Sequence, residues 1–221
     1  MGFGALRVIN DDRIAPYSGF GAHSHRDMEI ITLVTAGVLT HKDSMGNVGT
    51  VRAGEVQVMS AGSGVAHSEY NDEDEALTLF QIWITPHTLN VAPRYDQRSF
   101  PPAKGEQLLV GPLDSVRVPA LGIHQSAFIS RLTISGGESI EYRIKQKRNG
   151  AYFFVIQGDI EGSIKEIPRR YGVGLNVDTT GEKLSERDAL GVSEAESITL
   201  AALKDSEVLV FDVPLNGTDI T

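Results

Sequence analysis

The chain has 221 residues, a formal net charge of −9 and no cysteine. The absence of thiols excludes disulfides, thiolate metal sites, iron–sulfur clusters and a cysteine nucleophile. A surface with this acidic balance repels phosphate backbones, so we expect no direct binding to nucleic acid.

Neither a secretion signal nor a membrane span is visible in the sequence. The N-terminal residues MGFGALRVINDDR lack the basic stretch and apolar run of a signal peptide. No segment approaches the ~20 apolar residues that a membrane-spanning helix needs. We therefore expect a soluble cytoplasmic protein without a membrane partner.

Short runs rich in β-branched and aromatic residues follow one another along the chain, separated by turn residues. We predict strands at Ala5–Ile9, Glu29–Thr35, Val38–His41, Thr50–Val51, Glu55–Ser60, Ala66–Tyr70, Leu77–Ile84, Gln107–Val110, Val116–Val118, Ile123–Leu132, Ser139–Ile144, Ala151–Gln157, Gly172–Val177, Ala189–Val192, Ser197–Ala202 and Glu207–Val213. One short helix is predicted over Glu182–Arg187. The 23 glycines at hairpin spacing favour an all-β sandwich or barrel over a fold of alternating strands and helices.

A linker is predicted near Gln97–Gly105, where Pro101, Pro102 and Gly105 interrupt the strand pattern. Each half then has about a hundred residues, the size of one small barrel. We interpret the chain as two tandem barrels, residues 1–105 and residues 106–221.

Two pairs of polar residues carry the candidate chemistry. His23 and His25 are separated by one residue, as are His67 and Glu69. In an extended strand such neighbours project from the same face. Together the two pairs offer three imidazole nitrogens and one carboxylate oxygen, a set that suits Fe(II), Mn(II), Ni(II), Cu(II) or Zn(II). Glu29 lies four residues after His25, so strand parity leaves it open as the carboxylate ligand or as a partner that orients an imidazole.

The other histidines are lone and are interpreted as structural or solvated. His41 precedes Lys42 and Asp43 at an expected hairpin end, and His87 follows a proline in a loop. His124 stands in the second half, where no HxH or HxE occurs, so we expect a second barrel without metal ligands.

These segments resemble the cupin superfamily and, within it, the pirin family closely. The stretches MGFGALRVINDD, HSHRDMEI, DSMGN, MSAGSGVAHSEYN, QIWI and PRYDQRSF occur here in the pirin order. The general cupin turn PxG is replaced by Ser60-Ala61-Gly62, which is itself typical of pirins. The match is dense over residues 1 to 100 and thinner afterwards. The resemblance implies two tandem cupin-type (jelly-roll) barrels, the first metal-binding and the second not.

The resemblance also implies the ligands and an activity. In pirin-like proteins the HxH pair and a later HxE hold the metal, which selects His23, His25, His67 and Glu69 and moves Glu29 out of the ligand set. The implied cofactor is one divalent transition metal, Fe(II) first, with Ni, Cu, Mn, Co or Zn as alternatives. The implied reaction is that of a quercetin 2,3-dioxygenase, an oxidoreductase that opens a flavonol with O2, with Glu69 as the catalytic base. Ile30, Met59 and Phe80 would give this site an apolar wall.

An alternative function remains open at this point. Some pirins are non-enzymatic regulators, so a metal-binding or redox-sensing protein that acts through a protein partner is the second hypothesis. Pirin-like chains also usually begin a few dozen residues before the MGF segment, so we expect those opening residues of the family to be absent here.

Overall fold

Nineteen strands make up the secondary structure of the part of the chain that the computed structural model describes, residues 2–164 and 181–215. The prediction of an all-β fold is confirmed. The chain divides into two compact units. Among the described residues, the first unit contains 2–102 and 109–126, and the second contains 103–108, 127–164 and 181–215.

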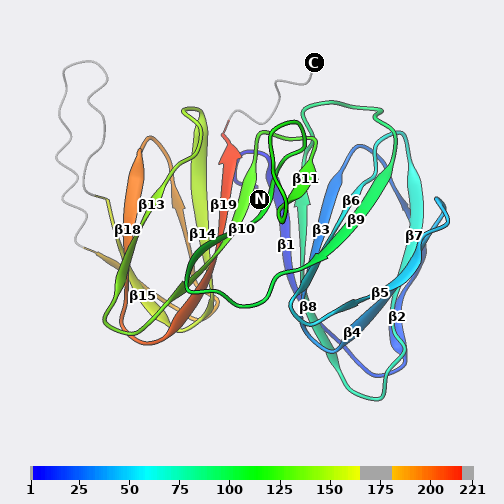
Figure 1. The fold of residues 1–221 in the computed structure, drawn as a ribbon, viewed down its shortest axis with the longest axis horizontal. Coiled ribbons are helices and arrows are strands. Elements are labelled where there is room, and N and C mark those ends of the chain that lie inside the picture. Colours follow the sequence, from blue (N-terminus) through cyan, green and yellow to red (C-terminus); the bar gives the residue numbers. More distant parts are fainter. Residues whose placement is uncertain (1, 165–180, 216–221) are drawn as a thin grey trace. The chain divides into compact units, whose positions relative to one another are not determined.

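The first unit is a barrel of two antiparallel sheets (Figure 1). One sheet has the order β1 (Leu6–Ile14), β8 (Leu77–Ile84), β3 (Glu29–Ala36), β6 (Glu55–Ser60) and β9 (Arg94–Ser99). The other has the order β2 (Ser18–His25), β7 (Val65–Asn71), β4 (Val38–Asp43) and β5 (Val48–Arg52).

The core of this barrel lies between its two sheets. Ile14, Val34, Leu77 and Leu79 come from the first sheet, and Leu39 and Val51 come from the second. Burial of these aliphatic side chains contributes roughly 1.5–3 kcal/mol each. This packing holds the two sheets face to face.

The second unit is built in the same way from two sheets. One has the order β10 (Gly105–Pro112), β12 (Phe128–Ile134), β19 (Ser206–Pro214), β14 (Asn149–Gln157) and β17 (Ala189–Val192); the other has β13 (Ser139–Arg143), β18 (Ser197–Ala202), β15 (Asp159–Ser163) and β16 (Glu182–Ser185). The end of β10 belongs to the first unit and pairs in parallel with β11 (Leu121–Ile123). Phe153, Leu132 and Ile198 are among the side chains that fill the core.

Several predicted elements are wrong. The helix over Glu182–Arg187 is the strand β16, which pairs with β15 and buries Leu184. The strand over Val116–Val118 is a turn, because the N–H of Val116 donates to the carbonyl of Pro112. The predicted strand Ile123–Leu132 is interrupted, since His124 and Gln125 bond to the chain just after β8.

The predicted linker also needs correction, because Gln97 and Ser99 belong to β9, which pairs with β6. The side chains of β9 are mostly half-buried. Its sequence RYDQRS therefore lacks the alternation of buried and exposed residues that marks a strand. The predicted strand Gly172–Val177 lies outside the described residues.

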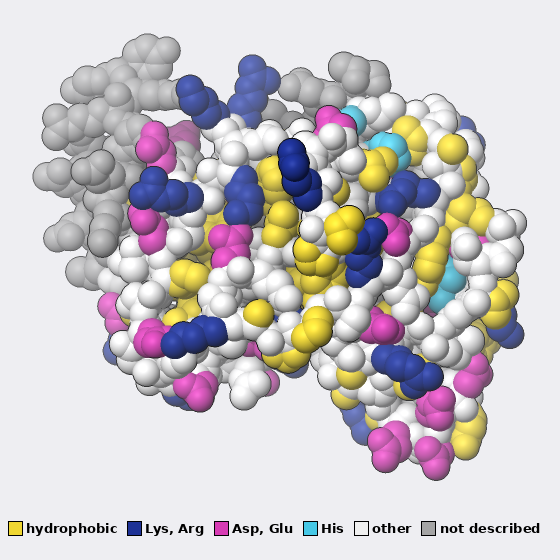
Figure 2. Space-filling model, viewed as in Figure 1, with side chains coloured by type: hydrophobic (Ala, Val, Ile, Leu, Met, Phe, Trp, Pro, Cys, Tyr) yellow, Lys and Arg dark blue, Asp and Glu magenta, His cyan; other side chains and the backbone are white. Residues whose placement is uncertain are grey.

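No helix long and apolar enough to span a membrane occurs in residues 2–164 and 181–215. On the face drawn in Figure 2, basic and acidic side chains are interspersed over the surface.

Candidate metal centre

The second sheet of the first unit brings the predicted site residues together. In this sheet β7 lies between β2 and β4. His67 of β7 is opposite His23 of β2, and Glu69 of β7 is opposite His41 of β4. Directly opposite residues of an antiparallel pair project from the same face. The register therefore places side chains from three strands on one surface.

Strand alternation decides which side chains of β7 point inward. Val65, His67 and Glu69 are buried, and the residues between them are half-exposed. On β2 the pairing with β7 is irregular between Phe20 and His23. A bulge of this kind changes the direction of the strand and re-aims the side chains that follow it. Here it precedes the two histidines that face His67.

The three imidazole rings of the predicted site converge. The ring centroid of His67 lies 4.4 Å from that of His23 and 5.0 Å from that of His25, and the latter two are 4.8 Å apart. One ring nitrogen from each residue lies within 4.8 Å of the others. Glu69 forms a second group with His67 and His41 by the same measure. His67 therefore belongs to both groups.

His23 and His67 each have a ring nitrogen with a lone pair that a metal ion could use. The Nδ1 of His23 lies 2.8 Å from the carbonyl oxygen of Gly21. A carbonyl only accepts, so Nδ1 carries the proton and Nε2 keeps its lone pair. Burial, and then the rings of His23, His25 and His41, lowers the pKa of His67 to about 3. His67 is therefore neutral near pH 7 and has a lone pair to offer.

His67 also provides a test of whether a metal fits this site. Both of its ring nitrogens are buried, and neither has a hydrogen-bond partner in the described part of the chain. A buried polar atom without a partner costs about 1–3 kcal/mol. A metal ion coordinated by three convergent imidazoles would relieve this cost at one of the two nitrogens, so the residues present fit a bound transition metal.

Glu69 is held by two glutamine side chains. Gln57 Nε2 donates to its Oε1 at 2.9 Å, and Gln81 Nε2 donates to its Oε2 at 2.7 Å. Burial raises the pKa of Glu69, and the neighbouring His41 ring and these hydrogen bonds partly offset the rise. Each carboxylate oxygen can accept two hydrogen bonds, so each keeps one free lone pair.

The orientation of the two amides is itself fixed. Trp83 Nε1 donates to Gln81 Oε1 at 3.2 Å, and the Tyr95 hydroxyl donates to Gln57 Oε1 at 3.2 Å. With the amide oxygens occupied as acceptors, the NH2 groups of Gln57 and Gln81 turn toward Glu69. This arrangement could not be found from the sequence, because it joins residues of β6, β7, β8 and β9.

His41 was missed as part of this neighbourhood. It was interpreted as a solvated or structural residue at a hairpin end, yet its side chain is fully buried and its ring lies 5.5 Å from that of His67. The ring also stacks on Tyr95 at 4.8 Å. The sequence contained a signal, since His41 and Asp43 have the same one-residue spacing as the two predicted pairs.

The parity argument for Glu29 was wrong. His25 ends β2 and Glu29 begins β3 in the other sheet, and the chain turns between them at Asp27, whose φ is 48°. Glu29 accepts a hydrogen bond from the Ser60 hydroxyl at 2.7 Å. Burial raises its pKa to about 7. It belongs to neither group of potential ligands.

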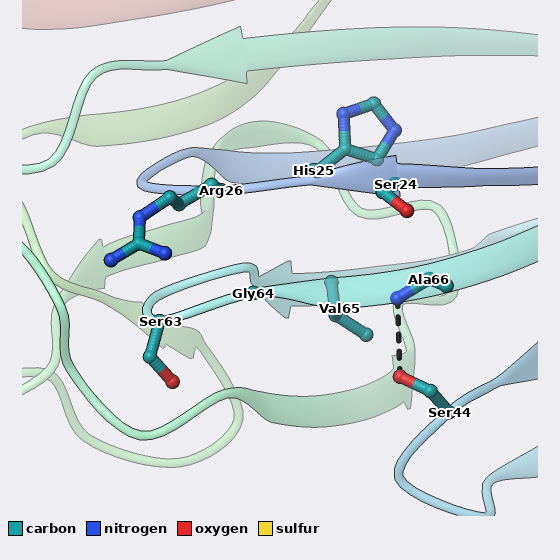
Figure 3. Close-up of a pocket in the computed structure, with 8 residues that line it drawn as sticks. All are labelled: Ser24, His25, Arg26, Ser44, Ser63, Gly64, Val65 and Ala66. Carbon is teal, nitrogen blue, oxygen red and sulfur yellow. Dashed lines mark hydrogen bonds between the residues drawn. The ribbon is translucent and has the colours of Figure 1, made fainter.

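The site is bordered by apolar side chains and by a polar cleft. Ile30 and Met59 form a buried cluster with Val65, and Trp83 packs against it and contacts His25 edge-on at 5.1 Å. Phe80, the third predicted wall residue, is buried but lies outside this cluster, because it stands between the inward-facing Leu79 and Gln81 on β8. A cleft of about 380 Å³ is lined by Ser24, His25, Arg26, Ser44, Ser63, Gly64, Val65 and Ala66. In Figure 3 the His25 ring and Ser24 project from opposite sides of β2.

Comparisons with known proteins agree with this architecture. The family model described as Pirin matches residues 1–84, and the model described as Quercetinase C-terminal cupin domain matches residues 115–178 and 173–213. The chain is 42% identical over 215 residues to a quercetin 2,3-dioxygenase of Escherichia coli, a match covering 97% of this chain and 84% of the relative. It is 39% identical over 214 residues to a pirin-like protein of Caulobacter vibrioides, covering 96% and 84%.

A solved structure is similar over the same range. The crystal structure of the bacterial pirin YhhW from Escherichia coli in complex with nickel(II) superposes with a TM-score of 0.84. The identity is 40%, and the match covers 97% of this chain and 84% of that one. Each of the two units is accordingly a barrel of the cupin type, as the sequence predicted.

Proposed function

The chain belongs to the pirin family, and we propose that it is a metal-dependent quercetin 2,3-dioxygenase that opens flavonols with O2. The observation that carries the proposal is the convergence of three imidazoles on one face of the second sheet of the first barrel, beside a buried carboxylate. The relative of Escherichia coli that shares 42% of its residues is a quercetin 2,3-dioxygenase, and the nickel(II) complex of a similar pirin supports a metal in this fold. We keep residues 1–105 as the metal-binding domain and 106–221 as a domain without metal ligands.

His23, His25, His67 and Glu69 would hold one divalent transition metal. Three imidazoles and one carboxylate accept several first-row metals, and the ion bound in a cell depends on supply as well as on affinity. Within this class we propose Fe(II), with Ni, Cu, Mn, Co and Zn as the ions to be compared with it. A cytoplasmic location stays a prediction from the sequence.

A bound metal would polarise the flavonol's 3-hydroxyl and lower its pKa. Glu69 would accept the released proton on one of its free lone pairs. Burial raises the pKa of Glu69 and so strengthens it as a base, while Gln57 and Gln81 keep its two oxygens in fixed positions. Glu69 is thus the proposed catalytic residue.

The remaining residues position the substrate and limit the access of water. Met59 and Val65 are buried, and Trp83 presents a large half-buried ring beside His25. Apolar and aromatic walls with a few fixed polar groups are typical of small-molecule sites. A flat aromatic substrate fits this lining.

The test begins with metal-free protein loaded anaerobically with one equivalent of Fe, Ni, Mn, Cu, Co or Zn. Quercetin and O2 are then added, and quercetin absorbance and carbon monoxide release are followed. We expect turnover with at least one metal, bound at one ion per chain. We expect loss of both binding and turnover in His67→Ala, whereas the control His87→Ala, which alters a loop histidine outside both ligand groups, should retain them.

Two results would count against the proposal. Stoichiometric metal binding without quercetin loss for any of these ions would refute the dioxygenase activity. Metal-dependent capture of a protein partner, together with absent turnover, would favour the regulatory alternative.

A further inference from the structure

β4 carries a third pair of inward side chains beside the proposed metal ligands. His41 is opposite Glu69 and Asp43 is opposite His67, and the side chains of His41 and Asp43 are fully buried. The one-residue spacing and the register put all four groups on the same face of the sheet. The polar residues on this face of the sheet therefore include His41 and Asp43 in addition to the four proposed metal ligands.

Asp43 fixes the tautomer of His41. The Nε2 of His41 lies 3.2 Å from Asp43 Oδ2. Asp43 also accepts hydrogen bonds from the backbone N–H groups of Met45 and Asn47 and from the Asn47 side chain. Because the Asp43 carboxylate acts as an acceptor in these contacts, Nε2 carries the proton and donates a hydrogen bond to Asp43.

In the neutral ring the other nitrogen of His41, Nδ1, carries a lone pair in a buried environment. Nδ1 has no hydrogen-bond partner in the described part of the chain, and the same holds for both nitrogens of His67. A ring nitrogen of His41, a ring nitrogen of His67 and a carboxylate oxygen of Glu69 lie within 4.8 Å of one another. Two buried imidazoles with unpartnered nitrogens thus surround a carboxylate.

We propose that His41, His67 and Glu69 form a second position for a divalent transition metal, deeper in the barrel than the position at His23 and His25. The Asp43–His41 pair repeats the carboxylate–histidine–metal arrangement that orients ligating imidazoles in metal sites. His67 belongs to both groups, and because a neutral imidazole has one lone pair, it can serve only one position at a time. The inner set adds a carboxylate to two imidazoles, and this negative charge favours a cation.

The two positions share ligands, and this determines how they are filled. Both use His67, and a metal at either position draws on Glu69. One ion therefore distributes between the two positions, and two ions cannot both obtain a full ligand set. The inner position needs neither His23 nor His25, which makes it separable by mutation from the site of the proposed function.

The experiment uses the full-length double variant His23→Ala/His25→Ala and Co(II) alone as the probe. Equilibrium dialysis measures stoichiometry and affinity, and the visible d–d absorption reports the ligand field. We expect one Co(II) per chain. Adding His41→Ala should weaken binding by more than about 100-fold, because loss of a ligand should exceed the roughly 10–100-fold cost of losing a group behind one.

Control variants keep the result interpretable. Adding His87→Ala to the double variant should leave affinity and spectrum unchanged. Adding Asp43→Asn should weaken binding by about 10–100-fold. If His41→Ala lowers the unfolding temperature of the apoprotein, His41→Gln replaces it, since glutamine keeps a polar side chain without a ring nitrogen.

The proposal is overturned if the double variant binds Co(II) no more tightly than the form that also lacks His41. It is likewise overturned if the spectrum of bound Co(II) does not respond to the His41 substitution. Failure of the dioxygenase proposal is seen separately, as absent quercetin turnover by the metal-loaded wild type. The two outcomes do not depend on each other.

Discussion

Gln81→Met tests whether the proposed carboxylate ligand is held in place by its amide partners. The substitution keeps an unbranched side chain of similar length and removes the donor that lies 2.7 Å from Glu69 Oε2. Gln57 continues to hold Oε1. The carboxylate of Glu69 is then held at Oε1 alone and can rotate, while the backbone of β8 and the three imidazoles are unchanged.

The size of the effect follows from the hydrogen bond that is lost. A hydrogen bond to a charged group contributes about 1.5–3 kcal/mol. At about 1.4 kcal/mol for each tenfold change, this corresponds to roughly 10–100-fold in metal affinity. The same range is usual for groups that orient metal ligands. The indole N–H of Trp83, which loses its acceptor, is half-exposed and can bond to water instead.

Nickel affinity is measured by competition with a chromophoric chelator at neutral pH. Gln146→Met, an exposed substitution of the same kind, is the control and should leave affinity unchanged. Thermal unfolding of the apoproteins separates a loss of affinity from a loss of folding. Wild-type affinity in a fully folded Gln81→Met protein would refute the view that this amide positions Glu69.

Three further predictions concern folding around the site. In Gly19→Ala the new Cβ would lie 2.3 Å from the carbonyl oxygen of Glu69, so β2 must move away from β7. Metal affinity and unfolding temperature should both fall. Gly49→Ala is the control and should change neither, because no atom lies within 4 Å of its new Cβ. Leu79→Ala should lower the free energy of unfolding, measured in urea, by about 2–5 kcal/mol, because Leu79 is fully buried. A change below about 1 kcal/mol, the size that surface substitutions give, would contradict the described core. The pKa of Glu29 is raised from 4.5 to about 7 in the folded state, so the protonated form of its side chain stabilises the fold at low pH. This contribution, about 3 kcal/mol, is lost as the pH rises from 4.5 through 7. Urea unfolding of the apoprotein across this range should therefore show a steeper loss of stability in wild type than in Glu29→Gln, and parallel curves would refute the assignment.

Strand periodicity was sufficient to predict the faces of the site residues. His23, His25, His67 and Glu69 were paired from their one-residue spacing, and the structure brings the three rings together with Glu69 beside His67. The all-β fold followed from short apolar runs and glycine turns. Periodicity is local, so it predicts which side chains share a face even in β2, whose residues are mostly exposed.

The errors arose where long-range pairing decides the environment. His41 looked like a solvated hairpin end because Lys42 and Asp43 follow it, but β4 lies in the middle of its sheet, between β7 and β5. Glu29 looked like a neighbour of His25 because the turn at Asp27 was not recognised. The sequence places the end of β9 in a linker, because pairing with β6, rather than the strand's own pattern, makes this segment a strand.

A site built from three neighbouring strands depends on the register of those strands more than on composition. A slip of one residue between β7 and β4 would move His41 and Asp43 to the opposite face and place Lys42 beside Glu69. The pairing of Asp43 with His67 is supported at the adjoining turn, where Asp43 accepts from Met45 and Asn47. Asp43 thus fixes the end of β4 as well as the tautomer of His41. Its replacement by alanine should therefore disturb the pairing of β4, whereas asparagine, which keeps an acceptor oxygen for the turn, isolates its effect on His41.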